Sequence, residues 1–306
     1  MVSLRPTIRG TISALLAALC FATVPALVLS AHSGGATVLT LLAVRYWLTS
    51  FVLVPVSVAA NRGRLPPLRQ LLRIMLISGI FLGLQAALYF FALTRLPSSI
   101  AVLVLFTFPL IITIHDWLTG KPASKDSILV LMLCLAGLAI LLGPDFSRLD
   151  IVGLGAALLA AIAYSVYMIL IDRSSTGMSP AVINAAVSLA NAITMTLAAV
   201  ATGTFQPDFN FRAWLSIILI VAVTNIAGMQ LFFIALKQLG PQRTAVLNMA
   251  EPLFAVLIGL AVLHEQLKAV QLTGAVVLMI GLTLFTWLSN HGEQMKSPEA
   301  REVEHD

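Results

Sequence analysis

The chain has 306 residues, of which 59% are hydrophobic and only 10% are charged, and its mean hydropathy is +0.99. Soluble domains carry about 25% charged residues, so this composition excludes an ordinary soluble protein and indicates an integral membrane protein. Taken alone, the net charge of +5 and the pI near 9.6 would suggest a nucleic-acid partner. Because the basic residues lie in short segments between long apolar runs, we expect a lipid bilayer around the protein and no nucleic acid.

Long apolar runs follow one another along the chain, separated by short polar connections. About 20 apolar residues cross a bilayer as a helix, so each run predicts one membrane span. Although Arg5 and Arg9 precede the first span as in a signal peptide, the repeat described below makes that span a structural helix. Ten spans are predicted, at residues 10–30, 36–59, 71–93, 97–117, 127–143, 150–171, 180–203, 213–236, 243–263 and 269–288.

The Lys and Arg residues are distributed unevenly between the two sides of these spans. With both termini in the cytoplasm, thirteen of them fall in cytoplasmic segments and four in external segments, namely Arg95, Arg148, Arg212 and Lys268. Arg45 lies inside the second span. The bias follows the positive-inside rule, so we expect both termini to be cytoplasmic.

Cysteine and histidine usage gives no sign of a disulfide, a metal or a cofactor. Cys20 and Cys134 both lie inside apolar runs, where small buried packing residues are expected. His264 and Glu265 begin like a zinc-protease motif, but Lys268 stands where the second histidine would be needed. No nucleotide-binding motif occurs either. We therefore expect no metal and no cofactor.

Two regions of the chain overlay without gaps when the sequence is shifted by 143 residues. The segment GTISALLAALCFA (10–22) falls on GLGAALLAAIAYS (153–165). The segment LYFFALTRLPSSIAVLVLFTFPL (88–110) falls on LFFIALKQLGPQRTAVLNMAEPL (231–253). Chance similarity between Leu- and Ala-rich helices is the alternative, but one offset in two separate places favours a true repeat.

The overlay pairs Gly10 with Gly153 and Pro109 with Pro252. Each copy holds five spans, and an odd number makes the second copy cross the membrane in the opposite sense, as in secondary transporters. The sequence therefore predicts an all-α polytopic membrane protein, with ten transmembrane helices as two five-helix inverted repeats around a central cavity. The expected parts are the two repeats at 1–146 and 147–290 and a disordered cytoplasmic tail at 291–306.

Five pieces of the chain carry a family resemblance over roughly residues 10–288. They are ALLAALCFATVPA in the first helix, AVRYWL (43–48), the segment 88–110 quoted above, AEPLFAVLIGLAVLHEQL (250–267) and QLTGAVVLMIGLTL (271–284). In these pieces the chain resembles the drug/metabolite transporter (DMT) superfamily, in particular its EamA-type members. One departure is GKPASKD in the first half, where such proteins often carry a Gly-Glu pair; Glu265 keeps the acid in the second half.

The resemblance implies a transporter whose halves enclose a cavity, in a family that includes exporters of amino acids and other small metabolites. We expect a multi-pass protein of the bacterial inner membrane, a monomer or weak homodimer. It would export a small amphipathic substrate such as an amino acid by alternating access, one five-helix half rocking against the other. The alternatives are an intramembrane enzyme, a passive channel or receptor, and a carrier of another substrate class such as drugs or sugars. Because neither a nucleophile–base pair nor a filter loop is found, the enzyme and the channel are disfavoured.

The matched prolines mark the first candidate site residues. A proline inside a membrane helix leaves a carbonyl without its donor, which is tolerated where protein or a water-filled cavity satisfies it. Matched interruptions in two halves point to a transport site, so Pro109 and Pro252 are assigned to it. Pro25 and Pro55, which have no such match, are interpreted as ordinary kinks.

Glu251 is the acid expected at mid-membrane, where a charge is costly unless it faces protein or water. Asn248 lies one helical turn before it on the same face, and the repeat places Phe108 opposite. Arg45 is the only basic residue deep within a span, which leaves open a buried ion pair between Arg45 and Glu251.

Other polar and aromatic side chains inside spans complete the predicted substrate cavity, although a membrane tyrosine can equally be a packing residue. These residues are Gln85, Tyr89, Tyr164, Tyr167, Asn225 and Gln230. His115 and Asp116 end the fourth span, where interfacial anchoring is expected rather than a proton relay. Gly79 and Gly83 form a GxxxG pattern, which predicts close helix packing.

Overall fold

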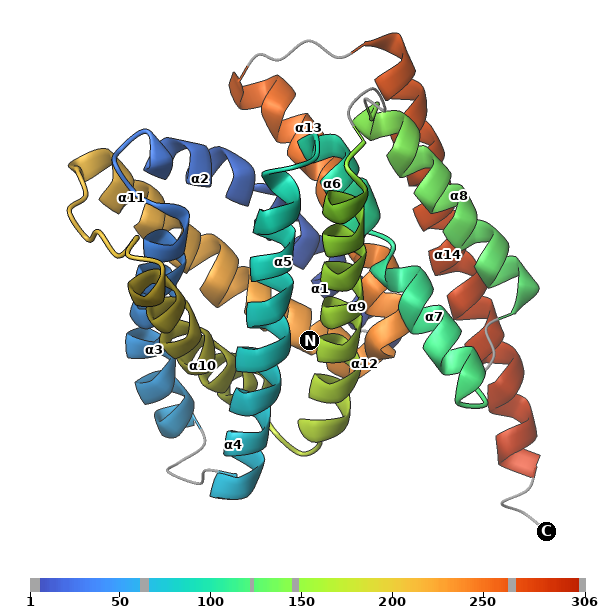
Figure 1. Ribbon diagram of the computed structural model, residues 1–306. Coiled ribbons are helices and arrows are strands. Elements are labelled where there is room, and N and C mark those ends of the chain that lie inside the picture. Colours follow the sequence, from blue (N-terminus) through green and yellow to red (C-terminus); the bar gives the residue numbers. More distant parts are fainter. Residues whose placement is uncertain (1–5, 61–65, 122–123, 145–148, 264–267, 303–306) are drawn as a thin grey trace.

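The computed structural model describes residues 6–60, 66–121, 124–144, 149–263 and 268–302 (Figure 1). Within these ranges the chain forms helices and no strand. This is the expected outcome for apolar runs in lipid, because a helix satisfies every backbone N–H and C=O within its own segment. Large apolar side chains such as Phe51 and Leu129, 71% and 70% exposed, make up the surface that lipid would cover.

The first half of the chain supplies five membrane spans, and three of them are interrupted. The first span consists of α1 (Pro6–Ala22) and α2 (Val24–His32), and the second is the unbroken α3 (Val38–Ala60). The third runs through α4 (Leu68–Ile77), the π-helix η1 (Ser78–Leu82) and α5 (Gly83–Leu93). The fourth is split into α6 (Ser98–Leu105) and α7 (Phe108–Leu118), and the fifth is α8 (Lys125–Leu142).

The second half supplies five more spans. They are α9 (Ile151–Ser174), α10 (Pro180–Ala201), the run of α11 (Phe211–Leu219), η3 (Ile220–Gly228) and α12 (Met229–Asn248), then α13 (Ala250–Leu263) and α14 (Ala269–Glu302). Gly240 has non-helical φ 76° and ψ 173° and precedes Pro241, so the chain turns there and α12 belongs to both the eighth and the ninth span. With this division the predicted ten-helix fold is confirmed for the described residues.

The C-terminal segment differs from the sequence-based expectation, and three residues used in that expectation lie outside the described ranges. α14 continues as a helix to Glu302, through most of the polar segment that composition predicts to be disordered. Extending an existing helix avoids the cost of nucleating a new one, which favours this continuation. Glu265, Arg5 and Arg148, which carried parts of the sequence argument, lie outside the described residues.

The helix interruptions follow the internal repeat. The turn between α6 and α7 begins at Phe106, and the turn between α12 and α13 is at Met249, 143 residues later. The π-helix η1 likewise falls, with the same offset, inside the π-helix η3. Inverted copies thus bring two broken helices and two π-distorted helices to the middle of the bundle, and such distortions occur frequently at functional sites.

The largest helix contacts join the two halves of the sequence. α3 packs along α10, α1 along α12, α5 along α9, and α8 along α14 (Figure 1). The predicted GxxxG packing is present, since added Cβ atoms at Gly79 and Gly83 would lie 3.0 Å and 2.8 Å from the Thr194 side chain of α10. In the described residues the helices of the two repeats therefore interdigitate.

The buried core differs between the two ends of the bundle. At the end where α9 finishes, called the Arg173 end, one apolar cluster joins both halves through residues such as Ile112, Ile171, Ile183 and Leu236. Toward the opposite end, called the Arg95 end, this cluster continues through residues such as Leu141 of α8, and two further clusters lie beside it. One joins α2, α3, α10 and α11, and the other joins α5, α6 and α9. One cluster therefore joins both halves at the Arg173 end, whereas the apolar contacts at the Arg95 end fall into several groups.

Asp150 connects two elements at the Arg95 end. Its Oδ1 accepts a hydrogen bond from the Gly153 amide at 2.7 Å and caps α9, and its Oδ2 lies 3.3 Å from Nη1 of Arg95. The Gly153 N–H and the Arg95 guanidinium lower the pKa of the Asp150 carboxyl below its ordinary value. The carboxylate is therefore ionised at neutral pH, where it favours the helix N-terminus.

Candidate functional site

A cavity of about 260 Å³ lies in the middle of the bundle, where the broken and π-distorted helices meet. Pro109 and Pro252 have no N–H, so the carbonyls four residues earlier, on Leu105 and Asn248, lack their usual helical donors. The matched breaks therefore border this space. The cavity is lined by Phe21, Val24, Arg45, Tyr46, Leu82, Gln85, Leu105, Phe106, Phe108, Tyr164, Tyr167, Thr224, Asn225, Met229, Phe232, Asn248 and Glu251.

Arg45 and Glu251 line the same cavity without forming the ion pair that the sequence left open. Nη2 of Arg45 donates to the Tyr46 hydroxyl at 3.3 Å, and its Cζ lies 4.8 Å from the centre of the Tyr46 ring. Its Nε is buried without a hydrogen-bond partner. In the described part of the chain Glu251 makes no ion pair. The aromatic neighbour holds the guanidinium on its own helix, which is why the two charges stay apart.

One wall of the cavity is aromatic. The rings of Phe108 and Tyr164 meet edge to face with centroids 4.8 Å apart, and Tyr164 stacks on Tyr167 at 6.0 Å. Phe106 contacts Phe108 at 5.8 Å. Such pairs fix each other's orientation, so this wall offers a rigid apolar surface to a ligand.

Several polar atoms around the cavity are buried and make no hydrogen bond to the protein. They are Nε of Arg45, the hydroxyl oxygens of Tyr167 and Thr224, and Oδ1 of Asn248. Buried polar groups are nearly always hydrogen-bonded, because an unpaired one is costly. A cluster of them around one cavity is the arrangement expected where a ligand or water completes the hydrogen bonds.

Asn225 has a structural role in addition to lining the cavity. Its Nδ2 donates to Oγ1 of Thr49 at 3.0 Å, and its backbone carbonyl accepts from Nδ2 of Asn184 at 2.9 Å. The π-helix η3 changes the backbone hydrogen-bond spacing there, which leaves the carbonyl available to α10. Asn225 therefore ties η3 to α3 and α10.

A second cavity of about 270 Å³ adjoins the first and extends toward the Arg95 end. The two share five lining residues, namely Val24, Arg45, Tyr46, Leu82 and Gln85. Tyr89 lines the second cavity only, together with Phe90 and Met195. Tyr89 thus lies beside the route from the inner cavity to the Arg95 end.

Not every predicted site residue lines a cavity. Pro109 and Pro252 are buried beside the breaks that they cause, and they contribute through the backbone. Gln230 is half-buried next to Met229, and its Oε1 has no hydrogen-bond partner. The remaining predicted residues, namely Gln85, Phe108, Tyr164, Tyr167, Asn225, Asn248 and Glu251, all line the inner cavity.

Sequence reasoning missed the contribution of the first span. Thr23 separates α1 from α2, and Pro25 lies in the first turn of α2, so Phe21 and Val24 face the inner cavity. Pro25 is therefore more than an ordinary kink. The repeat gave no signal here, because the equivalent position lies in the unbroken helix α9. Tyr46 was also missed, although its position beside Arg45 could have indicated it.

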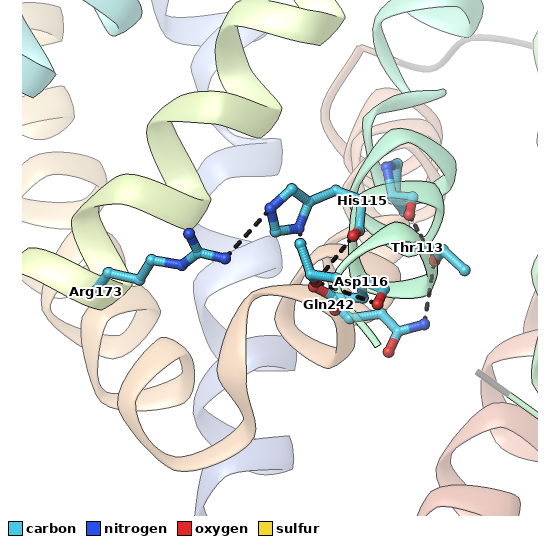
Figure 2. Close-up of polar contacts among 7 residues, drawn as sticks. Thr113, His115, Asp116, Arg173 and Gln242 are labelled. Carbon is cyan, nitrogen blue, oxygen red and sulfur yellow. Dashed lines mark hydrogen bonds and ion pairs between the residues drawn. The ribbon is translucent and has the colours of Figure 1, made fainter. Parts of the chain in front are cut away.

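Polar contacts join α7, α9 and α12 at the Arg173 end (Figure 2). Arg173 reaches across from α9 so that its Nη2 lies 3.3 Å from Nε2 of His115, whose Nδ1 lies 3.1 Å from Oδ1 of Asp116. With a proton on Nδ1 alone, the imidazole donates to Asp116 and accepts from Arg173. Gln242 donates to Oγ1 of Thr113 at 3.1 Å. Two cross-links between the sequence halves thus close this end beneath the cavity.

A fold of ten membrane spans in inverted repeats around a mid-membrane cavity defines a multi-pass membrane transporter. The sequence model of the EamA-like transporter family matches residues 8–143 and again residues 151–287. The chain therefore belongs to the EamA-like transporter family. This membership points to a transporter rather than to the intramembrane enzyme considered above.

Two curated relatives are threonine/homoserine exporters RhtA from Salmonella typhimurium strains SL1344 and LT2. Each is 30% identical to this chain over 201 residues, and the match spans 65% of this chain and 65% of the relative. A solved crystal structure superposes with a TM-score of 0.76 at 21% identity, over 92% of this chain and 98% of that chain. At that identity the superposition shows a shared fold alone.

Proposed function

We propose that this protein is a secondary transporter that exports small amphipathic metabolites such as amino acids across the bacterial inner membrane. The observation that carries the proposal is the inner cavity of about 260 Å³, which combines an aromatic wall with one acid, one base and unpaired amide and hydroxyl oxygens. Pockets for drug-sized ligands enclose about 300–1,000 Å³, so this size favours a small metabolite. Sugars would require more polar groups around the cavity.

The similarity to threonine/homoserine exporters supports an amino acid as the first substrate to test. The relatives match over only part of their length, so the direction and the substrate are the parts of the proposal that need measurement. We propose that the two repeats, at 1–146 and 147–290, contribute helices to both sides of the transport pathway.

Alternating access is the mechanism that the differing ends of the bundle support. If both termini are cytoplasmic, as the positive-inside bias predicts, the cross-linked Arg173 end faces the cytoplasm and the Arg95 end, where the apolar contacts fall into several groups, faces outward. The present conformation is then open outward, and the Arg173–His115 and Gln242–Thr113 contacts must break in the inward-open state. Since the halves interdigitate, each moving body has to contain helices from both repeats.

Counterflow into liposomes tests this function. The purified full chain would be reconstituted, the vesicles loaded with one unlabelled amino acid, and the same labelled compound added outside. The panel is L-threonine, L-homoserine, L-leucine and L-phenylalanine, with glucose as a polar compound of the alternative substrate class. We expect transient accumulation of at least one amino acid above its equilibrium level, because a carrier exchanges bound substrate.

Empty liposomes give the background of this assay, and loading either side tests the direction. Equilibration without accumulation would identify a channel instead, since a channel cannot couple opposite fluxes. Movement of glucose but of no amino acid would replace the proposed substrate class. Absence of movement for every compound would overturn the amino-acid assignment.

A further inference from the structure

Arg45 and Glu251 present two opposite charges to one cavity, and the described residues neutralise neither of them. The guanidinium contacts only the uncharged Tyr46 side chain, and no basic residue pairs with the Glu251 carboxylate. Charges within a membrane are rare and almost always paired. An acidic and a basic side chain that both lack an ion-pair partner around one small space therefore suit an occupant that carries both signs.

Two of the unpaired hydrogen-bonding atoms belong to Arg45 and to a neighbour of Glu251 along the chain. Asn248, whose buried Oδ1 has no hydrogen-bond partner, ends α12, and Glu251 lies in the first turn of α13 just beyond the break, where both line the inner cavity. Nε of Arg45, which is a free donor, belongs to the positive group. An unpaired donor on Arg45 and an unpaired acceptor on Asn248 therefore line the same cavity as the two ionisable side chains.

From this arrangement we propose that Arg45 and Glu251 form a two-charge binding site for a zwitterion. The guanidinium of Arg45 donates hydrogen bonds to the carboxylate of the bound molecule. The carboxylate of Glu251 and Oδ1 of Asn248 accept hydrogen bonds from its ammonium group. The proposal rests on the transport function above, and it deepens that function by naming the chemical feature that is recognised and the two residues that select it.

A zwitterion fits this site better than a singly charged molecule. An anion would satisfy Arg45 and leave Glu251 unpaired, and a cation would do the reverse, so each would lose one charged contact. The aromatic wall of Phe108 and Tyr164 adjoins the charged groups in the same cavity and can contact the side chain of the bound molecule. Fixed charges select the amino and carboxyl groups, while the aromatic wall tolerates different side chains.

The test uses three compounds for each amino acid of the panel. They are the amino acid itself, the 2-hydroxy acid that lacks the ammonium group, and the amide that lacks the carboxylate. Each unlabelled compound competes with counterflow of the labelled amino acid in liposomes that contain the full chain. Wild type is expected to prefer the zwitterion over both analogues by about 30-fold or more, because truncating one partner of a buried charge contact weakens binding by that order.

Two variants separate the contributions of the two charges. Glu251→Gln should reduce the preference over the 2-hydroxy acid to less than about 5-fold and keep the preference over the amide. Arg45→Gln should show the opposite pattern. Phe108→Leu is the matched cavity control, because it changes the preference among side chains and leaves both charge preferences intact.

A second measurement covers variants whose transport is too slow for competition. Thermal stabilisation of each purified variant by the same three compounds reports binding without turnover, and its pattern should match that of the competition. If both charge variants lost binding of all three compounds to the same extent, the two-charge site would be overturned and the two residues would have a purely structural role. Wild type that moves an amino acid and its two analogues equally well would overturn it too. Wild type that moves none of the compounds would instead overturn the amino-acid assignment on which this proposal rests.

Discussion

Glu251→Gln is expected to leave the amount of folded protein in the membrane close to that of wild type, while amino-acid transport per molecule falls about 30-fold or more. Had Glu251 been paired with Arg45, its removal would leave a buried unpaired charge and cost about 3–5 kcal/mol of stability. The described residues form no such pair, so the amide leaves no counter-ion stranded and keeps the shape of the side chain. Transport suffers because the charged contact to the substrate is lost.

The measurement compares folded yield, from the monodisperse peak of a fluorescent fusion, with the counterflow rate per folded molecule. Asp126→Asn is the matched control, since it makes the same chemical change in the exposed first turn of α8, away from the cavity. A low yield of the Glu251 variant with normal transport per molecule would show that the acid serves the fold instead.

Gly274→Ala is expected to destabilise the protein strongly, and Gly274→Leu to abolish most of the folded yield. An added Cβ at Gly274 would lie 2.3 Å from the backbone nitrogen of Leu141, and one at Gly137 would lie 2.6 Å from the backbone nitrogen of Leu278. Backbone atoms cannot rotate away, so α8 and α14 would have to separate along their length. Overpacking costs about 1–3 kcal/mol where side chains can adjust, and this contact allows less adjustment.

Gly155→Ala provides the matched control for this prediction. Gly155 also lies within a membrane helix, but an added Cβ there meets nothing within 4 Å. Alanine favours a helix over glycine by about 1 kcal/mol or less, so this change should be neutral or slightly stabilising. The midpoint of thermal unfolding in detergent compares the two. Equal midpoints would mean that α8 and α14 are not held together by their glycines.

The membrane spans and the paired helix breaks could be predicted from the sequence, because they follow from hydrophobicity and from the internal repeat. Apolar runs long enough to cross a bilayer gave the ten spans, since lipid leaves the backbone few alternatives. The repeat gave the paired breaks near Pro109 and Pro252, because a proline removes the same hydrogen bond in either copy. The sequence also pointed to polar residues that line the inner cavity, such as Gln85 and Asn248, because polar side chains are unusual in hydrocarbon.

The features that sequence could not give depend on tertiary packing. The π-helices η1 and η3 carry no residue signature, since one extra residue per turn is set by neighbouring helices rather than by propensity. The ion pair was left open because composition alone cannot tell whether Arg45 reaches across the cavity or lies against Tyr46. The expected mechanism, in which one five-helix half rocks against the other, assumed that the helices of each repeat pack mainly against one another. In the structure, α3 of the first repeat packs along α10 of the second, and α8 packs along α14.

The central claim is that the cavity between the matched helix breaks is the substrate pathway, and thiol labelling during transport tests it most directly. Cys20 and Cys134 would be replaced by alanine, and single cysteines introduced in turn at Val104, Phe108, Asn248 and Glu251. Leu236→Cys in the core, 1% exposed, is the control for a buried position outside the cavity.

We predict that Phe108→Cys and Asn248→Cys react with a small charged thiol reagent added from the external side. The transported amino acid should slow both reactions, because it occupies the same space, and the Leu236 control should stay unreactive. Inertness at Phe108, Asn248 and Glu251 together, which all line the cavity, or labelling that substrate leaves unchanged, would contradict the account.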